Sequence, residues 1–72
     1  MKQQNRKIAS NELITPEGKL LTQQVVELEA GFVARMRPLE NEEAQTEWLQ
    51  GRITLYREEN GICAYYQGKP LT

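Results

Sequence analysis

Residues 52–67 have the sequence RITLYREENGICAYYQ, in which two strand-forming runs flank the pair Asn60-Gly61. Asn-Gly is the strongest short signal for a two-residue β-hairpin, because a type I′ turn needs positive φ at both central positions. We therefore predict a hairpin closed by Asn60-Gly61, with Tyr56 opposite Tyr65. One face of this hairpin is apolar and carries Ile53, Leu55, Ile62, Ala64 and Tyr66.

A second hairpin is indicated by the sequence EAG at residues 29–31. A three-residue loop ending in Gly suits a type I turn followed by a left-handed residue. This loop sets Val26 opposite Ala34 and keeps one face largely apolar, whereas a two-residue Ala30-Gly31 loop sets Val26 opposite Arg35. Because register decides which face is buried, we predict the three-residue loop.

The first hairpin of the chain turns at residues 16–18, Pro-Glu-Gly. Its register places Leu13 opposite Leu21 and Ile14 opposite Leu20, so large apolar groups fall on both faces. Either a bulge near residues 22–24 switches the face, or both faces are covered. Pro38 is expected to end the third strand or to lie on a sheet edge, because proline cannot donate to a strand ladder.

The charged segment 41–50 is predicted to be a short helix or irregular, with Asn41 as N-cap and Gly51 as the stop. Residues 1–7 are expected to form a flexible segment and residues 8–72 a single small domain. The predicted fold is mainly β, with about five short antiparallel strands arranged as an open sheet, a small sandwich or a partial barrel.

Composition limits the partners and the chemistry. The net charge is −1, from nine basic and ten acidic residues, and the basic residues are dispersed, so no nucleic-acid footprint is expected. The single cysteine excludes an intrachain disulfide. No apolar run is long enough to cross a membrane, and no apolar core follows the polar N-terminus as in a secretory signal, so a cytoplasmic location is expected.

The sequence contains no recognisable catalytic constellation. The chain has no His and no Asp, which removes the common triads and imidazole metal sites, and no cofactor or tightly bound transition metal is expected. Cys63 is predicted to be a buried, unreactive residue. Four carboxylates could form a metal or general-acid site but more simply form a solvated face: Glu40, Glu42, Glu43 and Glu47.

Five residues are candidates for an interaction surface. Arg35 and Arg37 on one strand face could bind an anion, or could pair with glutamates across the sheet. Tyr56 and Tyr65 form an exposed aromatic pair if they face away from the core, or else Trp48 and its segment fold over them.

Residues 15–18 (TPEG), 25–33 (VVELEAGFV) and 51–55 (GRITL) resemble the opening of metal-dependent amidohydrolases. In that family a small β-sandwich domain precedes the catalytic barrel. The resemblance covers Ile8 to Leu55 and implies a freestanding relative of the non-catalytic domain. The family's His-x-His metal motif has no counterpart here, so no catalytic or metal residue is carried over.

Three functions therefore compete. The first is a non-catalytic β domain that self-associates or binds a protein, most simply as a homodimer joined through a free sheet edge at residues 52–59 or 8–15. The second is a small-molecule or anion-binding module that uses the two arginines. The third is an enzyme whose site contains only Glu, Lys, Tyr or Cys.

Overall fold

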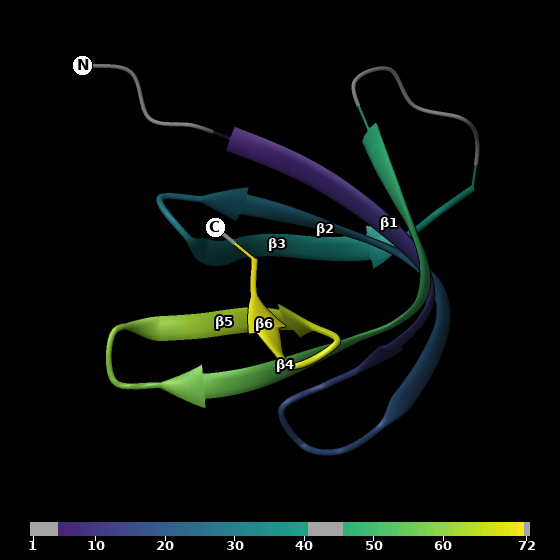
Figure 1. The fold of residues 1–72 in the computed structure, drawn as a ribbon. Coiled ribbons are helices and arrows are strands. Elements are labelled where there is room, and N and C mark those ends of the chain that lie inside the picture. The colour runs from purple at the N-terminus through teal and green to yellow at the C-terminus, as the bar shows by residue number, and fades with distance from the viewer. Residues whose placement is uncertain (1–4, 41–45, 72) are drawn as a thin grey trace.

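The computed structural model describes residues 5–40 and 46–71, and these form one open, mixed sheet (Figure 1). The order across the sheet is β3-β2-β1-β4-β5-β6, and only the central pair β1 and β4 is parallel. The mainly β prediction is confirmed, with one strand more than expected. The strands are β1 (Asn5–Ile14), β2 (Leu20–Glu29), β3 (Phe32–Pro38), β4 (Thr46–Glu58), β5 (Gly61–Tyr66) and β6 (Lys69–Pro70).

Three neighbouring strands depart from regular geometry at the same level. The β1–β4 register shifts between Ser10 and Glu12, Gln23 on β2 has φ 49°, and Gly51 on β4 has φ 111°. The Asn11 side-chain oxygen accepts a hydrogen bond from the Gly51 N–H at 2.8 Å, which holds β1 and β4 together at this point. Such irregularities bend strands, and Figure 1 shows β1, β2 and β4 all curving through this region.

The bend divides the sheet into two halves that enclose the core between them. The first half consists of residues 5–10, 24–38 and 46–49, and the second half consists of residues 12–14, 20–22 and 52–71. Burying each large aliphatic side chain contributes about 1.5–3 kcal/mol. The core cluster draws on both halves and contains Ile8, Leu13, Val26, Leu28, Ile53, Leu55 and Ala64.

The bend also explains which side chains of the first hairpin face the core. Leu13 pairs with Leu21 and Ile14 with Leu20, as predicted. Leu21 and Val26 both pack against the core. They lie an odd number of positions apart, and such side chains point to opposite faces of a regular strand, so β2 must change face between them. The positive φ of Gln23 lies at that change, while the β1–β2 register continues through this point without a shift, so the face changes near residues 22–24 as predicted but through the backbone conformation of Gln23 and not through a bulge.

The predicted loop of the second hairpin is wrong. The turn is the two-residue Ala30-Gly31 loop, with φ of 53° and 85°, as a type I′ turn requires. A register shift follows between Glu27 and Leu28, after which Val26 lies opposite Met36 and not Arg35. This bulge places Val26 opposite an apolar side chain, although that partner is Met36 and not the predicted Ala34.

The third hairpin forms, but its predicted register is wrong by two residues. Glu58 pairs with Gly61, so Glu59 and Asn60 form the turn, and Tyr56 lies opposite Cys63. A two-residue shift leaves every side chain on its predicted face. Gly61 instead allows close approach, since a Cβ there would lie 3.2 Å from the Phe32 ring at the point where β3 meets β5.

Other expectations also need correction. Residues 46–50 belong to β4 and not to a helix, because they pair with β1, while residues 41–45 lie outside the described residues. β1 begins at Asn5, inside the segment expected to be flexible, and residues 1–4 are not described.

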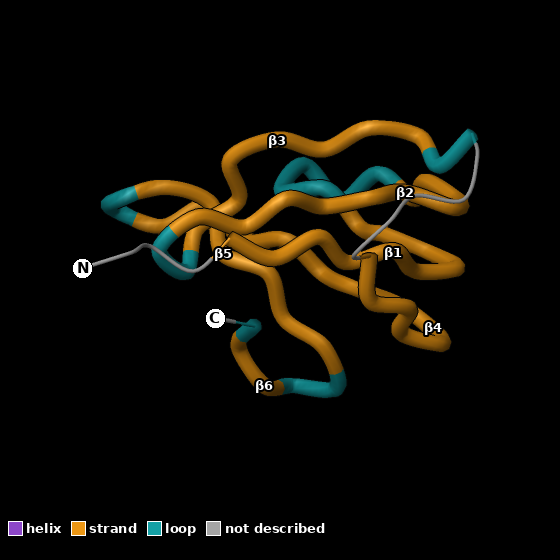
Figure 2. The backbone as a smooth tube through the Cα atoms, turned by 90° about the horizontal axis from the view of Figure 1, so that it is seen from above, coloured by secondary structure: helices purple, strands orange, loops and turns teal. Residues whose placement is uncertain are grey.

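The two segments proposed as sheet edges are the central strands of the sheet. Instead, β3 and β6 form the edges, and they lie on opposite sides of the molecule (Figure 2).

Candidate interaction surface

The five predicted interaction residues do not form one surface. Arg35 and Arg37 lie on β3 and Trp48 on β4, all in the first half of the sheet. Tyr56 and Tyr65 lie beyond the bend, in the second half. The two groups therefore occupy separate faces.

The face of the first half is held together by charges. Arg35 Nε lies 3.7 Å from a Glu27 carboxylate oxygen, and Arg37 donates to the same carboxylate. The predicted pairing of these arginines with glutamate is thus confirmed. Next to this cluster, Val25 and Ala9 are directed away from the core cluster and yet are only 0% and 2% exposed.

Arg37 and Trp48 flank those two small residues in the register of the sheet. Arg37 pairs with Val25, Val25 with Ala9, and Ala9 with Trp48. Trp48 is half-exposed and lies in this row, on the other side of the bend from the tyrosines. The alternative in which Trp48 folds over Tyr56 and Tyr65 is therefore wrong.

The face of the second half carries a row without any charged group. Successive Cα partners cross five strands at one level, and all five side chains lie on the face that is directed away from the core. Three of the five are partly buried and two are exposed, and Leu20 at one end is 48% exposed. We call this set the uncharged row; it consists of Leu20, Ile14, Thr54, Tyr65 and Pro70.

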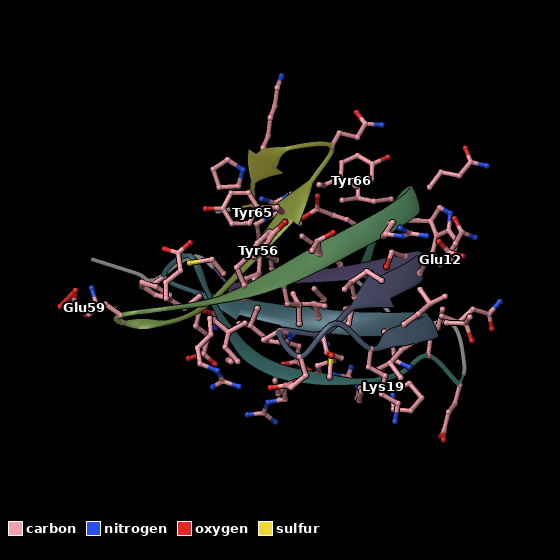
Figure 3. All side chains as sticks on the ribbon, turned by 90° about the horizontal axis from the view of Figure 1, so that it is seen from below. Glu12, Lys19, Tyr56, Glu59, Tyr65 and Tyr66 are labelled. Carbon is pink, nitrogen blue, oxygen red and sulfur yellow. The ribbon has the colours of Figure 1, made fainter. Side chains whose placement is uncertain are left out.

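The two tyrosines adjoin this row and contact each other (Figure 3). The rings of Tyr56 and Tyr65 meet edge to face with centroids 5.2 Å apart, a geometry that aromatic quadrupoles favour. The predicted aromatic pair exists, although the two residues are diagonal neighbours and not directly opposite. The Tyr65 hydroxyl donates to Glu58 at 3.1 Å, and this bond to a carboxylate raises the pKa of Tyr65.

Charged pairs border the uncharged row. Glu12 and Arg52 form an ion pair at 3.0 Å at the next level toward the bend, one on β1 and one on β4. Arg57 and Glu17 form another, at 2.8 Å, near the turn between β1 and β2. An apolar centre inside a charged rim is the anatomy of a protein-binding surface.

Cys63 also lies on this face, opposite Tyr56, and is partly buried rather than buried as predicted. Burial, followed by the neighbouring carboxylate of Glu58, raises the pKa of the Cys63 thiol. The thiolate is the reactive form, so a raised pKa lowers the reactivity of this cysteine.

The acidic candidates do not converge within the described residues. Glu47 pairs with Arg6 through two bonds of 2.7 and 2.8 Å, and this pairing lowers the pKa of Glu47. Glu40 is exposed, while Glu42 and Glu43 lie outside the described residues. Nowhere in residues 5–40 and 46–71 do three or more metal-binding side chains come together.

A small open hollow of about 210 Å³ lies at the far end of the first half. Its lining combines both charges with one leucine and includes Arg6, which is held by Glu47. It lies on the opposite side of the bend from the uncharged row. The lining residues are Asn5, Arg6, Lys7, Glu27, Leu28 and Glu29.

Comparison of this chain with protein-family models, curated proteins and solved structures found no match. The resemblance to the β domain of amidohydrolases therefore stays a prediction. Across the part of the chain that is described, no helix has the length and apolar character needed to cross a membrane.

Sequence reasoning missed Leu20, Ile14, Thr54 and Pro70 as parts of the surface. For Leu20 and Ile14 a signal was present. The first hairpin placed these two residues opposite each other on one face and Leu13 opposite Leu21 on the other face, so one of the two pairs had to lie outside the core. Thr54 could not be found in this way, since its position beside Ile14 depends on the parallel pairing of β1 with β4.

Proposed function

We propose that this chain is a non-catalytic β domain that acts by binding a protein through the uncharged row and the adjoining Tyr56. The observation that carries this proposal is the row itself, which crosses five strands without a charged side chain while Tyr56 beside it is 52% exposed. Contiguous apolar surface inside a charged rim is typical of surfaces that bind proteins.

A protein partner is favoured over a small anion, the second function considered above. Each of the five arginines lies in an ion pair with a glutamate, so an anion would have to displace a carboxylate. The hollow near Arg6 belongs to the other half of the sheet and has no contact with the row. Both points support recognition by an extended surface and not by a pocket.

The non-catalytic part of the proposal is supported by the residues that the chain lacks and by the state of its cysteine. The sequence has no His and no Asp, and the raised pKa of Cys63 keeps its thiol protonated at neutral pH. A cytoplasmic location belongs to the same proposal, since a single free cysteine suits a reducing compartment. Kinship with the amidohydrolase β domain is a separate prediction.

Site-specific photocrosslinking in the native cell tests the proposal. A benzophenone amino acid at Tyr56 should give a covalent adduct with a protein of discrete mass. The matched control is the same amino acid at Arg35, whose side chain is 67% exposed on the other half of the sheet. Adducts from Arg35 but not from Tyr56, or from neither position, would contradict binding through this face.

A further inference from the structure

We propose that the partner of this face is a second copy of the chain. The two copies are related by a two-fold axis that lies between their facing sheets, parallel to the strands and over the junction of β1 with β4. This inference rests on the proposed function and specifies its partner. The observation that carries it is the arrangement of the face about the junction between β1 and β4. Uncharged side chains occupy equivalent positions on the two sides of this junction, and the charged residues at the next level have opposite signs.

The geometry of that junction makes the face compatible with itself. β1 and β4 are adjacent and parallel, and β2 and β5 lie outside them, one on each side. A two-fold rotation about the proposed axis places β1 of one copy over β4 of the other, and β2 over β5. Ile14 then lies against Thr54 of the partner, and Leu20 against Tyr65 of the partner, in an isologous contact.

The charges at the next level are complementary under the same rotation. Glu12 and Arg52 are Cα partners across the β1–β4 junction, so they occupy equivalent positions on its two sides. The rotation brings Glu12 over Arg52 of the partner and Arg52 over Glu12 of the partner. Each carboxylate then meets two guanidinium groups, and each guanidinium group meets two carboxylates. An unrelated apolar partner would not require this arrangement.

Size and packing agree with a second copy. The face extends over five strands from β2 to β6, about 20 Å at the usual strand spacing, and aligned sheets pack face to face about 10 Å apart. The net charge of −1 opposes association only weakly.

The test exchanges the two charges between chains. We expect sedimentation equilibrium of the 72-residue chain to give twice the monomer mass of 8.3 kDa at micromolar concentration. Glu12→Arg and Arg52→Glu should each weaken the dimer by roughly 100-fold, because like charges then meet across the axis. Mixing the two variants should restore the dimer, since each remaining charge finds its opposite on the other chain.

The mixed sample distinguishes contacts between chains from contacts within a chain. Each variant has lost the ion pair between positions 12 and 52 of its own chain, so a restored dimer must come from contacts between the chains. Arg6 and Glu47 provide the matched control, since they bridge the same two strands in the other half of the sheet. Glu47→Arg and Arg6→Glu should leave the mass unchanged. Circular dichroism of each variant confirms that it is folded, and the doubly reversed chain should also dimerise.

Two results would overturn the inference. One is a wild-type mass that stays at 8.3 kDa up to high micromolar concentration. The other is a dimer that survives both single reversals, which would place the contact elsewhere. A monomer whose Tyr56 position crosslinks to a different protein would end this inference and leave the proposed function standing, whereas a monomer without any adduct would end both.

Discussion

The apolar residues on the outer faces of the two halves of the bent sheet differ in their exposure to solvent. In the first half Val25 and Ala9 are almost completely buried, although they are directed away from the core. In the second half Leu20 and Tyr56 are about half exposed. Both faces are built on the same central strands, β1 and β4, so strand composition alone does not separate them.

The difference lies in what surrounds the apolar residues. In the first half they are flanked by long side chains of the same chain, Arg37 and Trp48, and Glu27 holds the arginine in place. In the second half the charged residues stand at the border of the uncharged row and pair with one another. The first face is therefore complete within one chain, and the second has the form of a surface that is covered by another molecule.

The largest expected effect comes from placing a carboxylate on each face. Val25→Asp should lower the free energy of unfolding by about 3 kcal/mol or more, because a carboxylate replaces a fully buried apolar side chain and the neighbouring Arg37 is already paired with Glu27. Tyr56→Asp should cost less than about 1 kcal/mol in dilute protein, since its side chain already meets solvent. Urea denaturation at low concentration measures both, and equal costs would remove the distinction between the two faces.

A second effect should appear at the bend that separates the faces. Gly51 has φ 111°, so Gly51→Val should cost about 1–3 kcal/mol through backbone strain. Gln50→Val is the matched control, because that exposed neighbour has no positive φ and should change stability by less than about 0.5 kcal/mol. Urea denaturation compares the two, and a Gly51→Val chain as stable as the control would show that the bend does not depend on this residue.

The smallest effect should appear in the pH dependence of the ion pair in the first half. Pairing with Arg6 lowers the pKa of Glu47, so this pair contributes stability above the ordinary carboxylate pKa and loses it as pH falls through the lowered value. The contribution is about 0.2–1 kcal/mol, because both partners meet solvent. Unfolding followed by Trp48 fluorescence between neutral and acidic pH should therefore show a weaker pH dependence in Glu47→Gln. An unchanged slope would contradict the role of the pair.

Much of the fold followed from local sequence patterns. Alternation of apolar residues placed Ile53, Leu55 and Ala64 on the core face, and this assignment survived a two-residue error in register because side chains alternate with a period of two. The errors arose where turns meet bulges. At Ala30-Gly31 the local signal could not reveal that a bulge between Glu27 and Leu28 accompanies a two-residue turn, and at Gly61 it could not reveal that the glycine lies close to Phe32 and outside the turn.

What the sequence by itself determined was the mainly β class, the three hairpins, the faces of their strands and the pairing of Tyr56 with Tyr65 as neighbours on one face. Only the tertiary structure decided that β1 and β4 pair in parallel, that three strands bend at Asn11, Gln23 and Gly51, and that the candidate residues fall on two separate faces. The physical reason is range. Turn and alternation signals act over a few residues, whereas the uncharged row is assembled by contacts between strands far apart in the chain, which no local pattern encodes.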